Sequence, residues 1–193
     1  MSTKAFLDAN VLFPGYLADL LLSIAGPETF LPCWSEEVMN ELRRNLLNRV
    51  GVNSSKIEKR IRVMNDSFPT ATIYHYDKLE SSLTEVNPKD RHVLAAAIAA
   101  GANSLVTLNL KDFPKDMKEK YGVELLSPDA FFSDQFSQNP EEVTYRLALL
   151  LKRWNNPKIN IDQLIVIFRG VLPDFTKAIE AHRVDLAHKL SLL

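Results

Sequence analysis

Short apolar runs alternate with amphipathic segments through much of this chain. Residues 4–7, 28–32, 70–76, 104–108 and 121–126 are typical of strands, whereas residues 14–25 and 87–101 carry apolar side chains at helical spacing. Parallel strands need long crossover connections, which are usually helical, so this alternation favours a parallel sheet with helices on both faces. We therefore expect an α/β domain, and the carboxyl ends of its strands are the expected place for a ligand.

The end of the chain has a different pattern. Residues 143–154, 161–168 and 175–190 each read as one amphipathic helix, and no strand pattern lies between them. We place an α/β domain at residues 1–134 and a helical C-terminal extension at residues 135–193. The apolar stripes of these helices are expected to be buried against each other or against the sheet domain. The residues predicted to be buried are Leu147, Leu151, Ile165, Phe168, Ile179 and Leu186.

The charge of the chain is nearly balanced. There are 23 Lys and Arg residues against 24 Asp and Glu residues, for a net charge of -1, so no global field indicates a nucleic-acid partner. Residues 41–62 are locally basic, and Arg43 and Arg44 in this stretch are candidate contacts for an RNA backbone. The alternative interpretation is that this stretch only forms solvated helix faces.

The sequence also bounds the compartment in which we expect the protein. Its one cysteine, Cys33, lies in an apolar run and is expected to be a buried, inert thiol, which is compatible with a reducing compartment. No apolar run approaches the roughly 20 residues that a membrane helix needs, and the N-terminus lacks a signal-peptide pattern. We expect a cytoplasmic protein without membrane contact.

Acidic residues recur where strands end and where helices begin. Asp8 directly follows the first apolar run, and Asp112 follows the strand pattern at residues 104–108. Glu41 lies about 60° from the buried stripe of its helix, and Asp90 lies in the first turn of another helix. Each has an ordinary alternative: an Asx turn for Asp8, a solvated glutamate for Glu41, a macrodipole-favoured acid for Asp90, and a turn acid for Asp112.

In a parallel sheet these four acids converge at one edge. Two unit charges about 4 Å apart repel by on the order of 4 kcal/mol at an effective dielectric near 20, so such a cluster needs raised pKa values or a divalent cation. Oxygen ligands suit Mg²⁺ or Mn²⁺, which in nucleases activate water at a phosphodiester. We do not place His92 in this site, because no Cys or second His lies at metal-ligand spacing. No glycine-rich phosphate loop is present, which disfavours kinases and dinucleotide enzymes.

Four motifs in this order resemble the PIN domain over about residues 3–133. They are Leu-Asp-Ala-Asn at 7–10, Glu-Val-Met-Asn-Glu-Leu at 37–42, Pro-Lys-Asp-Arg-His-Val-Leu-Ala-Ala-Ala at 88–97 and Val-Thr-Leu-Asn-Leu-Lys-Asp-Phe at 106–113. The resemblance implies a three-layer α/β/α fold, RNA cleavage dependent on Mg²⁺ or Mn²⁺, and frequent homodimers. Many bacterial members are VapC-like toxins paired with an antitoxin protein. By this resemblance the catalytic and metal-binding residues are Asp8, Glu41, Asp90 and Asp112, and the residues that orient ligands or water are Asn10, Thr107 and Asn109.

Two departures from that family leave alternatives open. The helical extension lies outside the compact family domain, so the resemblance does not say how this protein is inhibited or which partner it binds. In some members the fourth acid stands nearer the threonine, where this chain has Asn109. The fourth ligand of the site is therefore either Asn109 or Asp112. We expect a toxin-type ribonuclease; the alternative is a catalytically idle PIN-like module that binds RNA or protein through the basic stretch and the extension.

Overall fold

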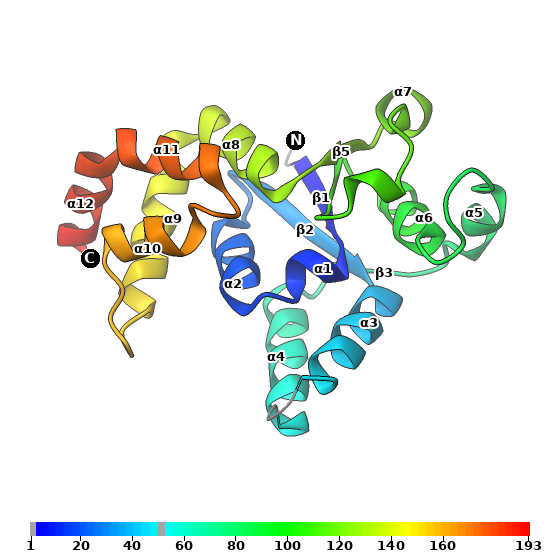
Figure 1. The fold of residues 1–193 in the computed structure, drawn as a ribbon, viewed down its shortest axis with the longest axis horizontal. Helices are drawn as coiled ribbons and strands as arrows, with labels where there is room; N and C mark the ends of the chain where they lie inside the picture. The colour runs from blue at the N-terminus through cyan, green and yellow to red at the C-terminus, as the bar shows by residue number, and fades with distance from the viewer. Residues whose placement is uncertain (1–2, 50–52) are drawn as a thin grey trace.

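A five-stranded parallel sheet forms the centre of the computed structural model, which describes residues 3–49 and 53–193 (Figure 1). The strand order is β3-β2-β1-β4-β5, and every neighbouring pair is parallel. The predicted α/β class is therefore confirmed. The strands are β1 (Thr3–Leu7), β2 (Phe30–Ser35), β3 (Thr72–Ile73), β4 (Ser104–Val106) and β5 (Glu124–Leu126).

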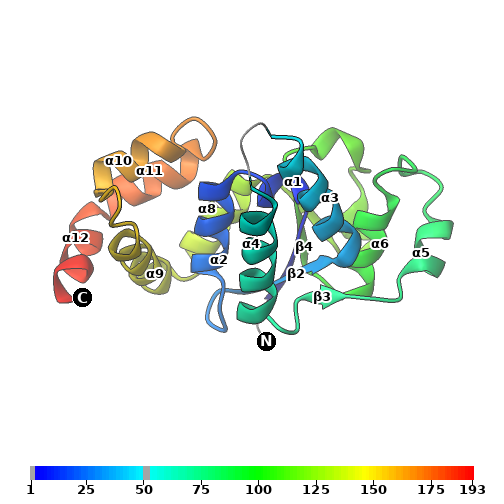
Figure 2. The same cartoon turned by 90° about the horizontal axis from the view of Figure 1, so that it is seen from below.

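Helices cover both faces of this sheet. In Figure 2, α3 and α6 lie on one side of the strands and α2 and α8 on the other, which is the layered arrangement expected for parallel strands. The helices of this part of the chain are α1 (Ala9–Leu12), α2 (Gly15–Ile24), α3 (Glu36–Leu47), α4 (Ser54–Ser67), α5 (Asp77–Ser82), α6 (Arg91–Ala99), the 3₁₀ turn η1 (Leu110–Asp112), α7 (Met117–Tyr121) and α8 (Pro128–Gln138).

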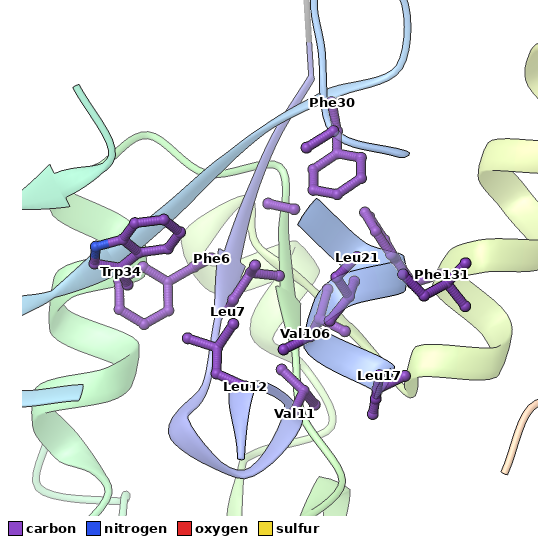
Figure 3. Packing of buried hydrophobic residues seen from close by; sticks show 14 of the residues in the cluster. Phe6, Leu7, Val11, Leu12, Leu17, Leu21, Phe30, Trp34, Val106 and Phe131 are labelled. Atoms are coloured by element: carbon purple, nitrogen blue, oxygen red, sulfur yellow. The ribbon is translucent and has the colours of Figure 1, made fainter. Parts of the chain in front are cut away.

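The central position of β1 explains its composition. Side chains alternate along a strand, so Phe6 and Leu7 face opposite sides of the sheet, and both are fully buried (Figure 3). Trp34 of β2 is also fully buried and donates its indole N–H to Asn65 at 3.2 Å. Cys33 beside it is buried, and this burial raises the pKa of its thiol to about 12, which confirms the expectation of an inert cysteine.

Several predicted boundaries were wrong. The strand expected at residues 28–32 lies instead at Phe30–Ser35, because its buried side chains extend through Trp34 to Ser35. The strand expected at residues 70–76 forms only at Thr72–Ile73. The helix expected from Asn87 begins at Arg91, since the Asn87 carbonyl accepts the Asp90 amide at 2.8 Å and closes a turn before it.

The C-terminal helices gather beside the α2 and α8 side of the sheet (Figure 1). The six apolar residues predicted to be buried there are all buried, which confirms the stripe assignment. The expected third helix was wrong in one respect: the chain leaves helical geometry at His182 (φ -104°, ψ 22°), which divides it in two. These helices are α9 (Pro140–Arg153), α10 (Ile161–Phe168), α11 (Pro173–Ala181) and α12 (Arg183–Leu192).

The sheet domain packs against these helices through both α8 and α2. The ring of Phe132 in α8 stacks on Phe175 of α11 with centroids 4.9 Å apart, and both rings are fully buried. The domain boundary predicted between residues 134 and 135 lies inside α8. Across residues 3–49 and 53–193, no helix has the length and hydrophobicity needed to span a membrane.

Candidate active site

Asp8 stands at the carboxyl end of the central strand, with 7% of its surface exposed. Its Oδ2 atom accepts hydrogen bonds from Asn10 Nδ2 at 2.6 Å and from Thr107 Oγ1 at 2.7 Å. Thr107 follows β4, the strand beside β1, and its side chain is fully buried. Two neighbouring strand ends therefore hold this carboxylate in one orientation.

Thr107 and Asn10 are also bonded to each other and to the backbone around them. Thr107 Oγ1 accepts from Asn10 Nδ2 at 2.9 Å and from the Asn109 amide at 3.0 Å. Asn10 Oδ1 accepts the Leu108 amide at 3.0 Å. The three residues predicted to orient ligands or water thus form one network with Asp8, in which Asn109 takes part through its backbone.

Glu41 approaches the same region from α3, and His92 from α6. His92 Nε2 lies 3.8 Å from Glu41 Oε1, and His92 Nδ1 lies 3.6 Å from Glu37 Oε2, one helical turn away on α3. Only 4% of His92 is exposed. We expected His92 to be a surface or hydrogen-bonded residue rather than a ligand, and the surface alternative was wrong, because α6 turns this side chain towards α3. Its spacing from the fully buried Ala95 and Ala96 is the signal that would have placed it on the buried face.

Asp90 and Asp112 complete the acidic cluster. Asp90 precedes α6, and its Oδ2 atom is buried without a hydrogen-bond partner in the described parts of the chain. Burial raises the pKa of Asp90; the nearby charge of Lys89 lowers it, and those of Asp112 and Asp8 raise it further. Asp112 lies in η1, the turn that follows β4. The electrostatic coupling links these three acids across three separate segments.

The cluster disfavours full ionisation. Burial raises the pKa of Asp8, and the hydrogen bond from Thr107 opposes the rise. Burial also raises the pKa of Glu41, where the positive charge of His92 would lower it and the charge of Asp8 raises it. When burial and mutual repulsion raise the pKa values of several neighbouring carboxyl groups, the site is typical of those in which a bound cation restores the charged carboxylates.

The donor chemistry of this cluster fits a hard divalent cation. All four predicted ligands offer carboxylate oxygens, and the buried Asp90 Oδ2 has an unused lone pair. Within the residues that the structure describes, no three His, Cys, Asp or Glu side chains converge closely enough to hold an ion as they stand. The residues that would hold Mg²⁺ or Mn²⁺ are Asp8, Glu41, Asp90 and Asp112.

The two predicted RNA contacts have different surroundings. Arg43 donates to Glu58 at 2.7 Å and to Asn40 at 2.5 Å, so its charge joins α3 to α4. Arg44 is 67% exposed and lies 3.9 Å from Glu41 at its nearest approach. Arg44 is therefore the freer of the two for a phosphate.

The protein is a parallel α/β domain in which the hydrogen-bonded Asp8 stands at the end of the central strand, and sequence comparison gives its family. Residues 4–111 match the PIN domain, which is more than half of the chain, so the chain belongs to the PIN domain family. Residues 128–181 match the VapC50 C-terminal domain.

One curated relative shares part of this sequence. It is "Putative ribonuclease VapC50" from Mycobacterium tuberculosis (strain ATCC 25618 / H37Rv), which is 32% identical over 106 residues, or 55% of this chain and 62% of the relative. The match thus spans less than two thirds of that relative. No solved structure gave a significant match.

Proposed function

We propose that this protein is a divalent-metal-dependent endoribonuclease and the toxin of a bacterial type II toxin–antitoxin pair. The observation that carries the proposal is the acidic cluster, in which burial raises the pKa of Asp8, Glu41 and Asp90 and the charge of Asp112 acts on Asp90. Membership of the PIN domain family and the name of the M. tuberculosis relative support the same activity.

In this proposal Asp8, Glu41, Asp90 and Asp112 would hold Mg²⁺ or Mn²⁺, and the bound ion would supply positive charge at the phosphodiester and make a water molecule more acidic. Thr107 and Asn10 keep the Asp8 carboxylate in place through their bonds to Oδ2. The Glu41 carboxylate is 32% exposed beside His92 and accepts the proton of the attacking water. Asn109 is assigned a water-orienting role, and Asp112 the fourth ligand position.

RNA is the substrate in this proposal, and its backbone meets Arg44, with Arg43 holding α3 against α4. The helical extension at residues 135–193 is assigned to partner contacts, with an antitoxin protein or a second copy of the chain as the partner. We propose the cytoplasm as the location, since a protein with this substrate and this partner would act there.

The direct test is cleavage of a 5′-labelled single-stranded RNA by the purified protein. Wild type should cut the RNA with Mg²⁺ or Mn²⁺ and stop when EDTA is added. Asp8→Asn should lower the rate by at least about 100-fold, because it removes a charge on the metal while keeping the size of the side chain. Asp116→Asn is the matched control, since Asp116 is exposed and makes no side-chain capping bond.

Induction in a bacterial host tests the toxin assignment separately. Wild type should arrest growth, and Asp8→Asn should relieve the arrest at an equal protein level. Cleavage in vitro without arrest would leave a nuclease that is not a toxin. Arrest that survives Asp8→Asn would instead support the idle binding module and contradict catalysis as the cause.

A further inference from the structure

We propose that a hollow beside the acidic cluster binds one base of single-stranded RNA and so selects where the chain cuts; this inference rests on the proposed function. The hollow has a volume of about 420 Å³. Its walls come from α1 and the two residues after it, from the C-terminal end of α3 and from the segment after β4. They are formed by Asn10, Phe13, Pro14, Asn45, Asn48 and Leu108.

The hollow begins one side chain away from the acids. Asn10 lines it and donates to Asp8 Oδ2 at 2.6 Å. The Leu108 amide donates to Asn10 Oδ1 at 3.0 Å, which fixes this wall. A nucleotide whose phosphate reaches Asp8 therefore has its base, or that of its neighbour, at the mouth of the hollow.

The lining suits a base rather than a phosphate. Asn45 lies in the last turn of α3, and Asn48 is the C-cap residue three positions later with helical φ and ψ, so their amides share one face of the helix end. Neither amide makes a side-chain hydrogen bond within residues 3–49 and 53–193, and both residues are exposed. An amide carries both donors and an acceptor and can pair with the edge of a base. The six lining residues carry no charge, and the cation beside them, the Arg49 guanidinium, lies over the Phe13 ring.

Flat and apolar surfaces complete the hollow. The Arg49 guanidinium lies over the Phe13 ring at 5.1 Å from its centroid. Leu108, on the β4 side, is 47% exposed. Unstacked RNA bases are held between aromatic, guanidinium and apolar surfaces of this kind while their edges form hydrogen bonds.

A second, cationic hollow of about 460 Å³ lies between α2 and α4, and Gly15, which lines it, directly follows Phe13 and Pro14 of the first hollow. Exposed Lys56 and Lys59 line it, together with Arg60, which donates to the backbone carbonyl of Leu12. Its one acid, Asp19, is bonded to Arg153 and Trp154. Figure 1 shows α1 between α2 and α3, with α4 below them. A strand leaving the amide hollow would thus pass its phosphates to the two lysines.

The test measures base preference without cleavage. Fluorescently labelled 12-nucleotide oligo(A), oligo(C) and oligo(U) are titrated by anisotropy in EDTA with wild type and with Asn45→Ala/Asn48→Ala. We expect wild type to prefer one of the three, and the ratio between its tightest and weakest Kd to fall by about 5-fold in the double variant, from the loss of amide hydrogen bonds. Alanine favours a helix, so the variant should fold, and its thermal unfolding checks this.

Two control proteins separate base from backbone contacts. Asn155→Ala makes the same amide-to-methyl change at an exposed site in the C-terminal region and should keep the wild-type preference. Lys56→Gln/Lys59→Gln should weaken the binding of all three RNAs alike. It should also reduce the salt dependence of binding, because it removes charges whose contact with phosphates releases counterions.

An unchanged preference in the double asparagine variant, or equal binding of the three RNAs by wild type, would overturn the inference. If the double asparagine variant loses the base preference while wild type binds RNA but does not cut it with Mn²⁺, the result would support this hollow and defeat the proposed nuclease. Failure of wild type to bind any of the RNAs in EDTA would also overturn the inference, whereas the proposed nuclease is decided separately by RNA cleavage with Mn²⁺.

Discussion

Replacing Thr107 by Val should destabilise the protein far more than its small change in shape suggests. The Thr107 hydroxyl donates to Asp8 Oδ2 at 2.7 Å and accepts from Asn10 Nδ2 at 2.9 Å and from the Asn109 amide at 3.0 Å. The side chain is fully buried, so water cannot replace these three partners. Valine fills the same volume, and the change therefore removes the hydroxyl without opening a cavity.

The magnitude follows from the kinds of bond that are lost. A hydrogen bond to a charged group contributes about 1.5–3 kcal/mol and a neutral one about 0.5–1.5 kcal/mol, and bonds that share one atom do not add fully. We expect the free energy of unfolding to fall by about 3 kcal/mol. For a chain of this length that corresponds to a decrease in Tm of roughly 6–12 °C.

The assay is thermal and urea unfolding at pH 7 in EDTA, with Thr107→Ser as the matched control. Serine keeps the hydroxyl and removes only a methyl group, so it should cost about 1 kcal/mol. Because the Thr107 bond favours the charged form of Asp8, part of the loss caused by valine should disappear at a pH low enough to protonate Asp8. Equal destabilisation by valine and serine would refute the role given to this network.

Three further predictions concern charge. Asp90→Asn should raise Tm in EDTA, because burial raises the pKa of Asp90 and its ionised form therefore destabilises the folded protein. With Mn²⁺, the same variant should lose most of the increase in Tm that the ion gives wild type. A group with a raised pKa binds more protons folded than unfolded, so this Tm advantage of Asp90→Asn should be absent below pH 3.8 and grow as pH rises through the folded pKa, as a pH series of melts would test. Arg44→Gln should reduce the slope of RNA affinity against salt by about 1 without changing Tm, whereas Arg43→Gln should lower Tm through its lost contact with Glu58.

The place of Asp8 in the site could be predicted from the sequence because it depends on a short local pattern. An apolar run that ends in an acid fixes where the acid stands once the strands are parallel, and the observed bonds of Asp8 to Asn10 and Thr107 follow from the pairing of β1 with β4. The alternation of strand and helix patterns is also local in the sequence, and it predicted the parallel sheet with helices on both faces.

The parts that the sequence did not predict depend on how helices rotate and end. The burial of His92 was not predicted, since the absence of a Cys or second His at ligand spacing left it as either a surface or a hydrogen-bonded residue, but the close packing of the alanine face of α6 buries it. The break at His182 follows no proline or glycine, so periodicity alone extended one helix through it. The hollow at Asn45 and Asn48 joins three segments that are distant in sequence, and exposed asparagines carry no signal of such a meeting.

The central claim is that four acids form one divalent-cation site, and calorimetric titration of Mn²⁺ tests it most directly. Asp8→Asn, Glu41→Gln, Asp90→Asn and Asp112→Asn are compared with wild type and with the control Asp116→Asn. We predict that each of the four weakens Mn²⁺ binding by at least about 10-fold, since a coordinated ion loses a charged ligand each time. Asp116→Asn should bind like wild type. Wild-type affinity in the Glu41 or Asp112 variant would contradict a shared site, and the absence of Mn²⁺ binding by wild type would contradict the account as a whole.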